Sequence, residues 1–353
     1  MRIFITCLFV LSWTFLFAEP SDRYLIGAHY YEWYNKKSWT KIESRPLLGK
    51  YNSMDDDVIA QHLQWAAQYG IDFFALEWSG IHKFSDQAIY KHIAVSPELK
   101  NVSFCISYDT LGRFGRYGNP PYNFSDPRIL HDFLADFDYL SQRYFSNPHY
   151  LKFQGRPVVW LYIARGMRGD WIGALQQARE VVKKNGFDLY LDGDLLQPEQ
   201  TDRSRFPYFD AISAYTVNQP KLFQRHHVKT TEDVANLSKK QFEKWSKLVS
   251  GTRNISSGNS IAFHPVITPQ FDDPKSQRSA EYWLKSVDDF RKFAENARDH
   301  ATYDEVAQAR VIWITSWNEW YEGSAIEPTP EGTSLQNEYG FKLLEVIKSV
   351  FGK

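Results

Sequence analysis

Two glutamates near the C-terminal end of the chain, Glu319 and Glu322, have the residue type and the neighbours that chemistry on a sugar requires. They end the segment Val311-Ile-Trp-Ile-Thr-Ser-Trp-Asn-Glu-Trp-Tyr-Glu-Gly323, which begins as a β-branched, aromatic run and then becomes acidic. Cleavage of a glycosidic bond needs two carboxyl groups at the bond. Aromatic side chains offer flat faces on which pyranose rings stack. This segment therefore predicts a catalytic site for glycans.

The spacing of the two glutamates sets a condition on the backbone. Residues three apart in a continuous strand point to opposite faces of the sheet. The chain must therefore turn between Glu319 and Glu322 if both carboxyls are to reach one sugar, and the exit from a strand offers such a turn. Two alternatives stay open: one glutamate is catalytic while the other binds hydroxyls, or both are structural.

The chain around these residues alternates between strand-like and helix-like segments. Apolar runs bounded by turn residues indicate strands that are buried on both faces, as in a parallel sheet. They predict eight strands, at Tyr24–Tyr30, Ile71–Glu77, Val102–Tyr108, Pro157–Ile163, Asp188–Asp192, Ala211–Tyr215, Ile261–Ile267 and Arg310–Thr315.

Helical patterns separate the strands and follow the last one. They predict helices at Asp55–Tyr69, Asp86–His92, Pro127–Phe145, Trp171–Asn185, Glu232–Leu248, Ser279–Asp299 and Ser334–Val350. The connection Gln197–Phe209 is short and contains proline, so we expect no regular helix there. Eight alternating units without a linker favour a closed (β/α)8 TIM barrel over an open doubly wound sheet. The predicted fold class is α/β, with one catalytic domain over residues 19–353.

Polar and aromatic residues follow the predicted strands at their C-terminal ends, where barrel enzymes carry their active sites. Beside the catalytic pair, the predicted substrate-binding residues are Tyr30, Tyr31, Trp33, Glu77, Trp78, Asp109, Tyr215, Trp317, Asn318, Trp320 and Tyr321. Any one of them alone could be a core aromatic or a solvated loop residue. Their convergence on one end of the barrel favours a site.

The overall composition favours an uncharged partner. The formal net charge is -1, so no global field attracts nucleic acid or an anionic membrane, and 16% of the residues are aromatic. The histidines His29, His62 and His264 are scattered without metal-ligand spacing, and neither a glycine-rich phosphate loop nor a Gly-x-Ser-x-Gly elbow is present. We expect an oligosaccharide or polysaccharide substrate, no metal and no cofactor.

The first 18 residues have the plan of a secretory signal peptide. A basic residue is followed by an apolar run and then by Ala18, ahead of Glu19-Pro20. We expect cleavage near Ala18 and a secreted or periplasmic mature chain without stable membrane insertion; an uncleaved anchor is the alternative. Cys7 leaves with the signal, which leaves Cys105 without a disulfide partner, and its apolar neighbours predict an inert core thiol.

Several of these motifs together resemble glycoside hydrolase family 99 and its family 99-like relatives, which include endo-α-mannosidases and endo-α-mannanases. The resemblance is carried by Trp317-Asn-Glu-Trp-Tyr-Glu-Gly323 with Glu327-Pro328, His29-Tyr-Tyr-Glu-Trp-Tyr34, Asp72-Phe-Phe-Ala-Leu-Glu-Trp78, Gly155-Arg-Pro-Val-Val-Trp160 and Phe209-Asp-Ala-Ile-Ser-Ala-Tyr215. These segments span most of the mature chain.

The resemblance implies a retaining, endo-acting hydrolase on a (β/α)8 barrel without a metal. By this resemblance Glu319 is the base that deprotonates the 2-hydroxyl of the sugar, which attacks C1 and forms a 1,2-anhydro sugar. Glu322 is the acid that protonates the leaving oxygen and later activates water. Tyr31 and Tyr215 match tyrosines that line the family's subsite.

The chain departs from the family pattern at two positions. Members tend to carry a glutamate after the third strand, where this chain has Ser107-Tyr108-Asp109, and often a histidine where it has Tyr321. Both positions lie where substrate hydroxyls would be read. The alternatives are therefore a hydrolase of another α-glycan and a barrel that binds carbohydrate without catalysis.

Overall fold

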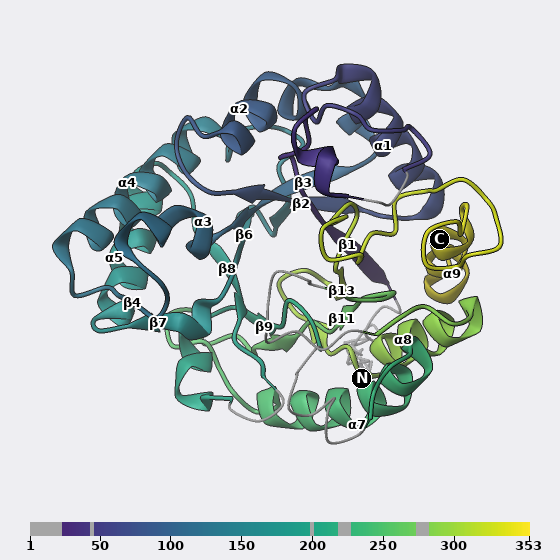
Figure 1. The fold of residues 1–353 in the computed structure, drawn as a ribbon. Helices are drawn as coiled ribbons and strands as arrows, with labels where there is room; N and C mark the ends of the chain where they lie inside the picture. Colours follow the sequence, from purple (N-terminus) through teal and green to yellow (C-terminus); the bar gives the residue numbers. More distant parts are fainter. Residues whose placement is uncertain (1–22, 43–45, 198–200, 218–226, 273–281) are drawn as a thin grey trace, which may run out of the picture.

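In the computed structural model, a parallel sheet closes into a barrel and helices surround it (Figure 1). The structure describes residues 23–42, 46–197, 201–217, 227–272 and 282–353. The predicted signal peptide and its cleavage site lie outside these residues. Within the described part of the chain, no helix is both long and apolar enough to cross a membrane.

The barrel strands are paired in parallel in the order β10-β9-β8-β6-β3-β2-β1-β13-β11. Their bounds are β1 Tyr24–Tyr30, β2 Phe73–Trp78, β3 Ser103–Tyr108, β6 Arg156–Leu161, β8 Tyr190–Asp194, β9 Ala211–Ser213, β10 Ala262–Phe263, β11 Val266–Ile267 and β13 Ala309–Ile314. Close packing inside the barrel requires glycine at Gly27, because a Cβ atom there would lie 2.2 Å from the ring of Phe73.

The barrel closes through the segment predicted as its seventh strand. That segment is two short strands, β10 and β11, separated by His264 and Pro265. β10 pairs with β9 and β11 pairs with β13, so the two ends of the sheet belong to one continuous stretch of chain. Proline has no N–H to donate, which interrupts the strand. The predicted α/β barrel is confirmed.

Two short strands extend the sheet at its rims: β5 Lys152–Phe153 and β12 Tyr303–Asp304 pair antiparallel with β6 and β13. β4 Tyr122–Asn123 and β7 Met167–Arg168 form a separate parallel pair.

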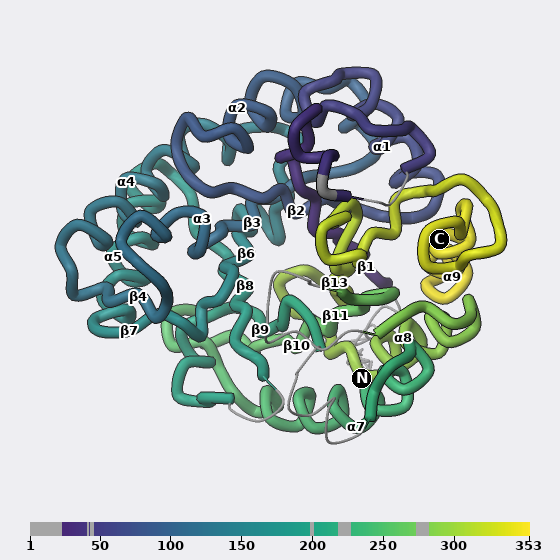
Figure 2. Tube along the Cα trace, viewed as in Figure 1, coloured from purple at the N-terminus to yellow at the C-terminus, as the bar shows by residue number. Residues whose placement is uncertain are grey.

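Helices form a ring around the barrel, and Figure 2 follows the chain through it. The α-helices among the described residues are α1 Asp56–Tyr69, α2 Phe84–Lys91, α3 Thr110–Phe114, α4 Pro127–Arg143, α5 Trp171–Lys184, α7 Thr231–Val249, α8 Val287–His300 and α9 Lys342–Phe351. The 3-10 helices are η1 Ser38–Lys41, η2 Ile93–Val95, η3 Pro97–Lys100, η4 Gly115–Tyr117, η5 Ala164–Gly166 and η6 Arg203–Tyr208. As expected, the described residues of the connection after β8 form η6 and no α-helix.

Two helices are shorter than predicted. The predicted start of α8 lies outside the described residues, and Tyr282 and Trp283 form β-bridges, so the helix begins only after Ser286, whose hydroxyl accepts from the N–H of Asp289. α9 begins at Lys342 because Gly340 adopts a left-handed conformation, with φ 59°.

Buried aromatic residues dominate the core. Trp78, Trp160, Trp313 and Trp317 are fully buried. Cys105 is also fully buried on β3, which confirms the predicted core thiol.

A buried charged group lies inside the barrel. His264 contacts Asp192 through Nδ1 at 2.7 Å and Asp304 through Nε2 at 3.2 Å, and Trp313 donates to Asp192. Burial alone would lower the pKa of His264, but the two carboxylates raise it to about 9. The imidazolium is therefore held inside the barrel at neutral pH.

Candidate active site

A small cavity of about 80 Å³ lies at the C-terminal ends of the barrel strands. We call it the strand-end cavity. Its walls are aromatic and carboxylic, and the described residues that line it are Tyr31, Trp33, Glu77, Ser107, Asp109, Trp160, Tyr162, Tyr215, Glu319 and Glu322. The two glutamates predicted as the catalytic pair thus face one cavity.

The chain turns between the two glutamates, as their spacing requires. The N–H of Ser324 donates to the carbonyl of Glu319 at 3.1 Å, and the N–H of Ser316 donates to the carbonyl of Ser324 at 2.9 Å. Gly323 has φ 63°, a conformation that glycine adopts without strain. This loop after β13 brings both carboxyls to the same side of the sheet.

The loop is fastened to the end of β1, and the two segments run side by side in Figures 1 and 2. The side chain of Asn318 accepts from the N–H of Tyr31 at 2.7 Å and donates to the carbonyl of Tyr31 at 2.9 Å. The hydroxyl of Tyr34 donates to the carbonyl of Asn318 and accepts from the N–H of Trp320. Asn318 is therefore a positioning residue for the two strand ends.

Glu327 supports the loop from behind. It is fully buried, accepts from the hydroxyl of Tyr51 at 2.7 Å and from the indole of Trp320 at 3.0 Å, and lies 3.0 Å from Nε2 of His62. Tyr30 in turn contacts Nδ1 of His62. A buried carboxylate is retained only where it is paired and hydrogen-bonded, so this network fixes the loop that carries the two glutamates predicted to be catalytic.

Two tyrosines form a chain of hydrogen bonds to Glu322. The hydroxyl of Tyr31 donates to the hydroxyl of Tyr215 at 2.8 Å, which donates to Oε2 of Glu322 at 2.8 Å. Glu319 is held differently, because its Oε1 accepts from the N–H of Tyr321 at 2.8 Å. Each carboxyl group of the pair therefore has its own orienting donor.

A second set of carboxyls lies across the cavity. Burial and the nearby Asp109 raise the pKa of Glu77 to about 8, and burial raises the pKa of Asp109 to about 6. Glu32 is fully buried; burial and the nearby Glu77 raise its pKa well above the ordinary value. Neither Glu32 oxygen nor Oε1 of Glu77 has a hydrogen-bond partner among the described residues. Glu77 is therefore held as a neutral acid at neutral pH and can donate to a ligand, and burial shifts the pKa of Glu32 in the same direction.

An aromatic floor lies beneath the cavity. The ring of His29 stacks on Trp313 at 5.1 Å and lies 4.2 Å from Trp160 and 5.7 Å from Tyr215, between ring centroids. Burial lowers the pKa of His29 to about 3, so the ring is neutral. No described residue forms a hydrogen bond with either ring nitrogen.

Not every predicted site residue lines the cavity. Tyr31, Trp33, Glu77, Asp109 and Tyr215 do. The others lie behind it or beside it, in the core or in the loop network: Tyr30, Trp78, Trp317, Asn318, Trp320 and Tyr321. Pattern alone cannot separate the two groups, because strand ends alternate between the cavity and the core behind it.

Four residues of the site were not predicted as substrate-binding. Ser107, Trp160 and Tyr162 line the cavity, and Glu32 is buried near Glu77. Trp160 and Tyr162 lie two residues apart at the end of β6, so both side chains face the barrel axis. That spacing in the sequence could have identified both residues as part of the site.

Among the described residues, no group of three or more histidine, cysteine, aspartate and glutamate side chains could hold a metal ion.

Comparison with known protein families identifies the family of the chain. A family model described as glycosyltransferase WbsX matches residues 126–346, which is more than half of the sequence. The chain belongs to the WbsX family. None of the curated proteins compared with this WbsX family member matches it.

Solved structures share the fold of this WbsX family member. A glycoside hydrolase-like protein superimposes with a TM-score of 0.70 at 19% identity, over 95% of each chain. The GH99 endo-alpha-mannosidase from Bacteroides thetaiotaomicron, in complex with bis-tris propane, gives a TM-score of 0.61 at 18% identity, over 95% of this chain and 98% of that one. A second structure of that enzyme gives 0.61 at 16% identity, over 94% and 97%. The resemblance to family 99 is confirmed at the level of the fold.

Proposed function

We propose that this chain is a retaining, endo-acting glycoside hydrolase that cleaves α-mannosidic linkages in a mannose-containing glycan. The observation that carries the proposal is the common cavity of Glu319 and Glu322, in which each carboxyl has a separate orienting donor. The fold shared with glycoside hydrolases supports the reaction class.

In the first step, Glu319 removes the proton from the 2-hydroxyl of the sugar, and O2 attacks C1 to form a 1,2-anhydro sugar. The bond from C1 to the leaving oxygen breaks, and that oxygen takes the proton of Glu322. A base for a hydroxyl needs only to reach O2, which suits a carboxylate held by the backbone N–H of Tyr321.

In the second step, Glu322 acts as the base. It takes a proton from a water molecule that attacks C1 and opens the anhydro ring, while Glu319 returns its proton to O2. Tyr215 donates to Oε2 of Glu322, which orients the carboxyl in both steps. Two displacements at C1 retain the anomeric configuration.

Product analysis tests the proposal. The protein is incubated with α-mannan, with high-mannose N-glycans and with an α-glucan, and the products are separated by size. We expect internal cleavage of a mannose-containing substrate. Cleavage of the α-glucan instead would assign another α-glycan, and binding without any product would assign a carbohydrate-binding barrel.

Glycosyl transfer is a second candidate function, because the family model is described as a glycosyltransferase. The same carboxyl pair could open an anhydro sugar with an acceptor hydroxyl in place of water. Two donors separate the candidates: a nucleotide sugar, which a biosynthetic transferase consumes, and an α-mannan oligosaccharide. We expect turnover of the oligosaccharide only.

We also propose that the chain is exported. The apolar run that ends at Ala18 supports this. N-terminal sequencing of the mature protein should give residue 19 as the first residue; an intact Met1 would favour a retained anchor.

A further inference from the structure

A second hollow, of about 670 Å³, lies at the same end of the barrel as the strand-end cavity. We call it the arginine hollow. It lies among the segments that follow β6 and β8 and includes η5 and the start of η6. Its described lining residues are Pro120, Pro121, Ile163, Arg165, Gly166, Arg168, Leu195, Gln197, Asp202 and Arg205. Three arginines face this hollow, whereas no lysine or arginine is among the described residues that line the strand-end cavity.

The two hollows share a wall. Tyr162 lines the strand-end cavity, and the next residue, Ile163, lines the arginine hollow. Asp194 connects them, because it accepts from the N–H of Tyr215 on one side and from the N–H of Ile163 on the other, and it also pairs with Arg165. A glycan bound across the strand-end cavity would therefore place a neighbouring sugar unit beside the arginines.

The three arginines of the hollow differ in burial: Arg205 is part of its buried wall, whereas Arg165 and Arg168 are accessible from it. Arg205 is mostly buried, donates to the carbonyls of Ala164 and Met167, and lies over the ring of Trp171. Arg165 keeps 28% of its side chain exposed beside Asp194. Arg168 is exposed, and its Nη1 atom donates to the carbonyls of Arg165 and Met167.

The charges around the hollow do not balance. The three arginines face two carboxylates, Asp194 and Asp202, and Asp202 also accepts from the N–H and the hydroxyl of Ser204. Burial and the nearby positive charge of Arg168 lower the pKa of Arg205. An anion bound between the guanidinium groups would relieve this repulsion.

We propose that the arginine hollow is a subsite for a sugar unit that carries a negative charge, and that the natural substrate is therefore an acidic glycan. The planar fork of arginine matches the oxygens of a carboxylate, phosphate or sulfate group. The inference rests on the proposed function, because it assigns the hollow to the same glycan that the carboxyl pair cleaves. The net charge of the whole chain gives no sign of such a subsite.

Binding to a catalytically inactive protein tests the subsite separately from the reaction. The Glu322→Gln variant is titrated by calorimetry with an α-mannan oligosaccharide that bears a uronic acid and with the same oligosaccharide after reduction of its carboxyl group. Phosphorylated and sulfated oligosaccharides form two further arms and identify the anionic group. We expect about tenfold tighter binding of an anionic form than of the neutral one, and loss of this preference at high salt.

Substitutions in the arginine hollow test whether the preference for the anionic oligosaccharide arises there. Arg168→Gln should remove most of the preference while the affinity for the neutral oligosaccharide stays within about twofold. Arg165→Lys keeps the charge beside Asp194 but loses the fork, and should reduce the preference in a protein that still folds. Arg298→Gln, on the outer helix α8, is the matched control and should change nothing.

Equal affinity for the anionic and neutral forms, or a preference that survives Arg168→Gln and Arg165→Lys, would overturn the subsite. Failure of the proposed function looks different: the wild-type protein would bind the acidic oligosaccharide with the expected preference and release no product. Cleavage of neutral and acidic substrates at equal rates and affinities would keep the hydrolase and remove the subsite.

Discussion

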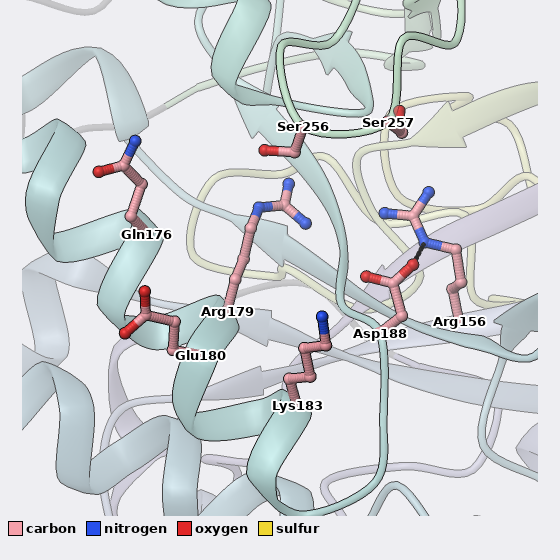
Figure 3. Close-up of a pocket in the computed structure, with 8 residues that line it drawn as sticks. All are labelled: Arg156, Gln176, Arg179, Glu180, Lys183, Asp188, Ser256 and Ser257. Atoms are coloured by element: carbon pink, nitrogen blue, oxygen red, sulfur yellow. Dashed lines mark ion pairs between the residues drawn. The ribbon is translucent and has the colours of Figure 1, made fainter.

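The two ends of the barrel use the same kinds of charged residue in opposite ways. At the N-terminal end, a hollow of about 790 Å³ is lined by Arg156, Gln176, Arg179, Glu180, Lys183, Asp188, Ser256 and Ser257 (Figure 3). We call it the basal hollow. At the C-terminal end, the strand-end cavity measures only about 80 Å³. The carboxyl pair lines the smaller of the two, so size does not identify the candidate site.

The arginines of the basal hollow are paired. Arg156 contacts Asp188 at 2.8 Å, as Figure 3 shows, and Asp210 at 2.7 Å, and Arg179 contacts Asp210 at 2.8 Å. Both arginines also donate to the carbonyl of Leu189. At the strand-end cavity, by contrast, buried oxygens of Glu32 and Glu77 have no partner among the described residues. Paired charges stabilise the fold, whereas buried polar atoms without a partner are typical of a ligand-binding site.

The largest expected effect is at Glu319. Glu319→Gln should lower the rate on every substrate by a factor of about 10² to 10⁴, because the base acts in the step that forms the intermediate. Steady-state kinetics with a glycan and with an activated aryl glycoside measure it. Lys183→Gln in the basal hollow is the control and should retain the wild-type rate. A Glu319→Gln variant with near wild-type activity would remove this residue from the mechanism.

Glu322→Gln should show a dependence on the leaving group. Hydrolysis of glycans should fall by about 10² to 10⁴, whereas aryl or fluoride glycosides should be spared more, because a good leaving group needs no protonation. The ratio of the two losses is the readout. Equal losses on both kinds of substrate would argue against an acid role for Glu322.

His264 lies between the two ends of the barrel and should make stability depend on pH. The folded protein holds its proton up to a pKa of about 9, whereas the unfolded chain releases it near the ordinary value of about 6.5. The contribution is therefore complete below pH 6.5 and is lost as the pH rises to 9, by about 3 kcal/mol. Denaturant unfolding between pH 6 and 9 should show this loss in the wild type and a smaller slope in His264→Gln. Identical slopes would contradict the assignment.

Arg179→Gln should have the smallest effect, and it should be on stability alone. Loss of its charged hydrogen bond to Asp210 should lower the free energy of unfolding by about 1.5 to 3 kcal/mol. Activity per folded molecule should not change, because Arg179 lies at the end of the barrel away from the carboxyl pair. A loss of kcat in a fully folded Arg179→Gln protein would contradict the claim that the basal hollow contributes to stability alone.

Most of the fold could be predicted from the sequence, because the hydrophobic periodicity of strands and helices is a local property of the chain. It predicted every barrel strand. It missed the short helices such as α3, the short strands β4, β5, β7 and β12, the division of the seventh barrel strand by His264 and Pro265, and the late starts of two helices. Those starts depend on tertiary contacts, such as the β-bridge of Trp283 with Thr230. A local pattern does not contain such contacts.

The site was harder to predict than the fold. The residue types and the strand ends indicated Glu319, Glu322 and Tyr215, which meet in the cavity. They could not show that Asn318 joins the two strand ends by hydrogen bonds or that Glu32 lies near Glu77, because both facts depend on residues far apart in the chain. Nor does a net charge of -1 reveal three arginines in one hollow.

The stereochemistry of the first product tests the central claim most directly. Hydrolysis of an α-mannan oligosaccharide is followed by proton NMR, and the anomer that appears before mutarotation is identified. Because O2 of an α-mannoside is trans to the leaving oxygen, attack by O2 and then by water predicts the α anomer, and a 2-deoxy analogue should not react. First formation of the β anomer, or a covalent ester trapped on Glu319 with a 2-fluoro sugar, would contradict the account.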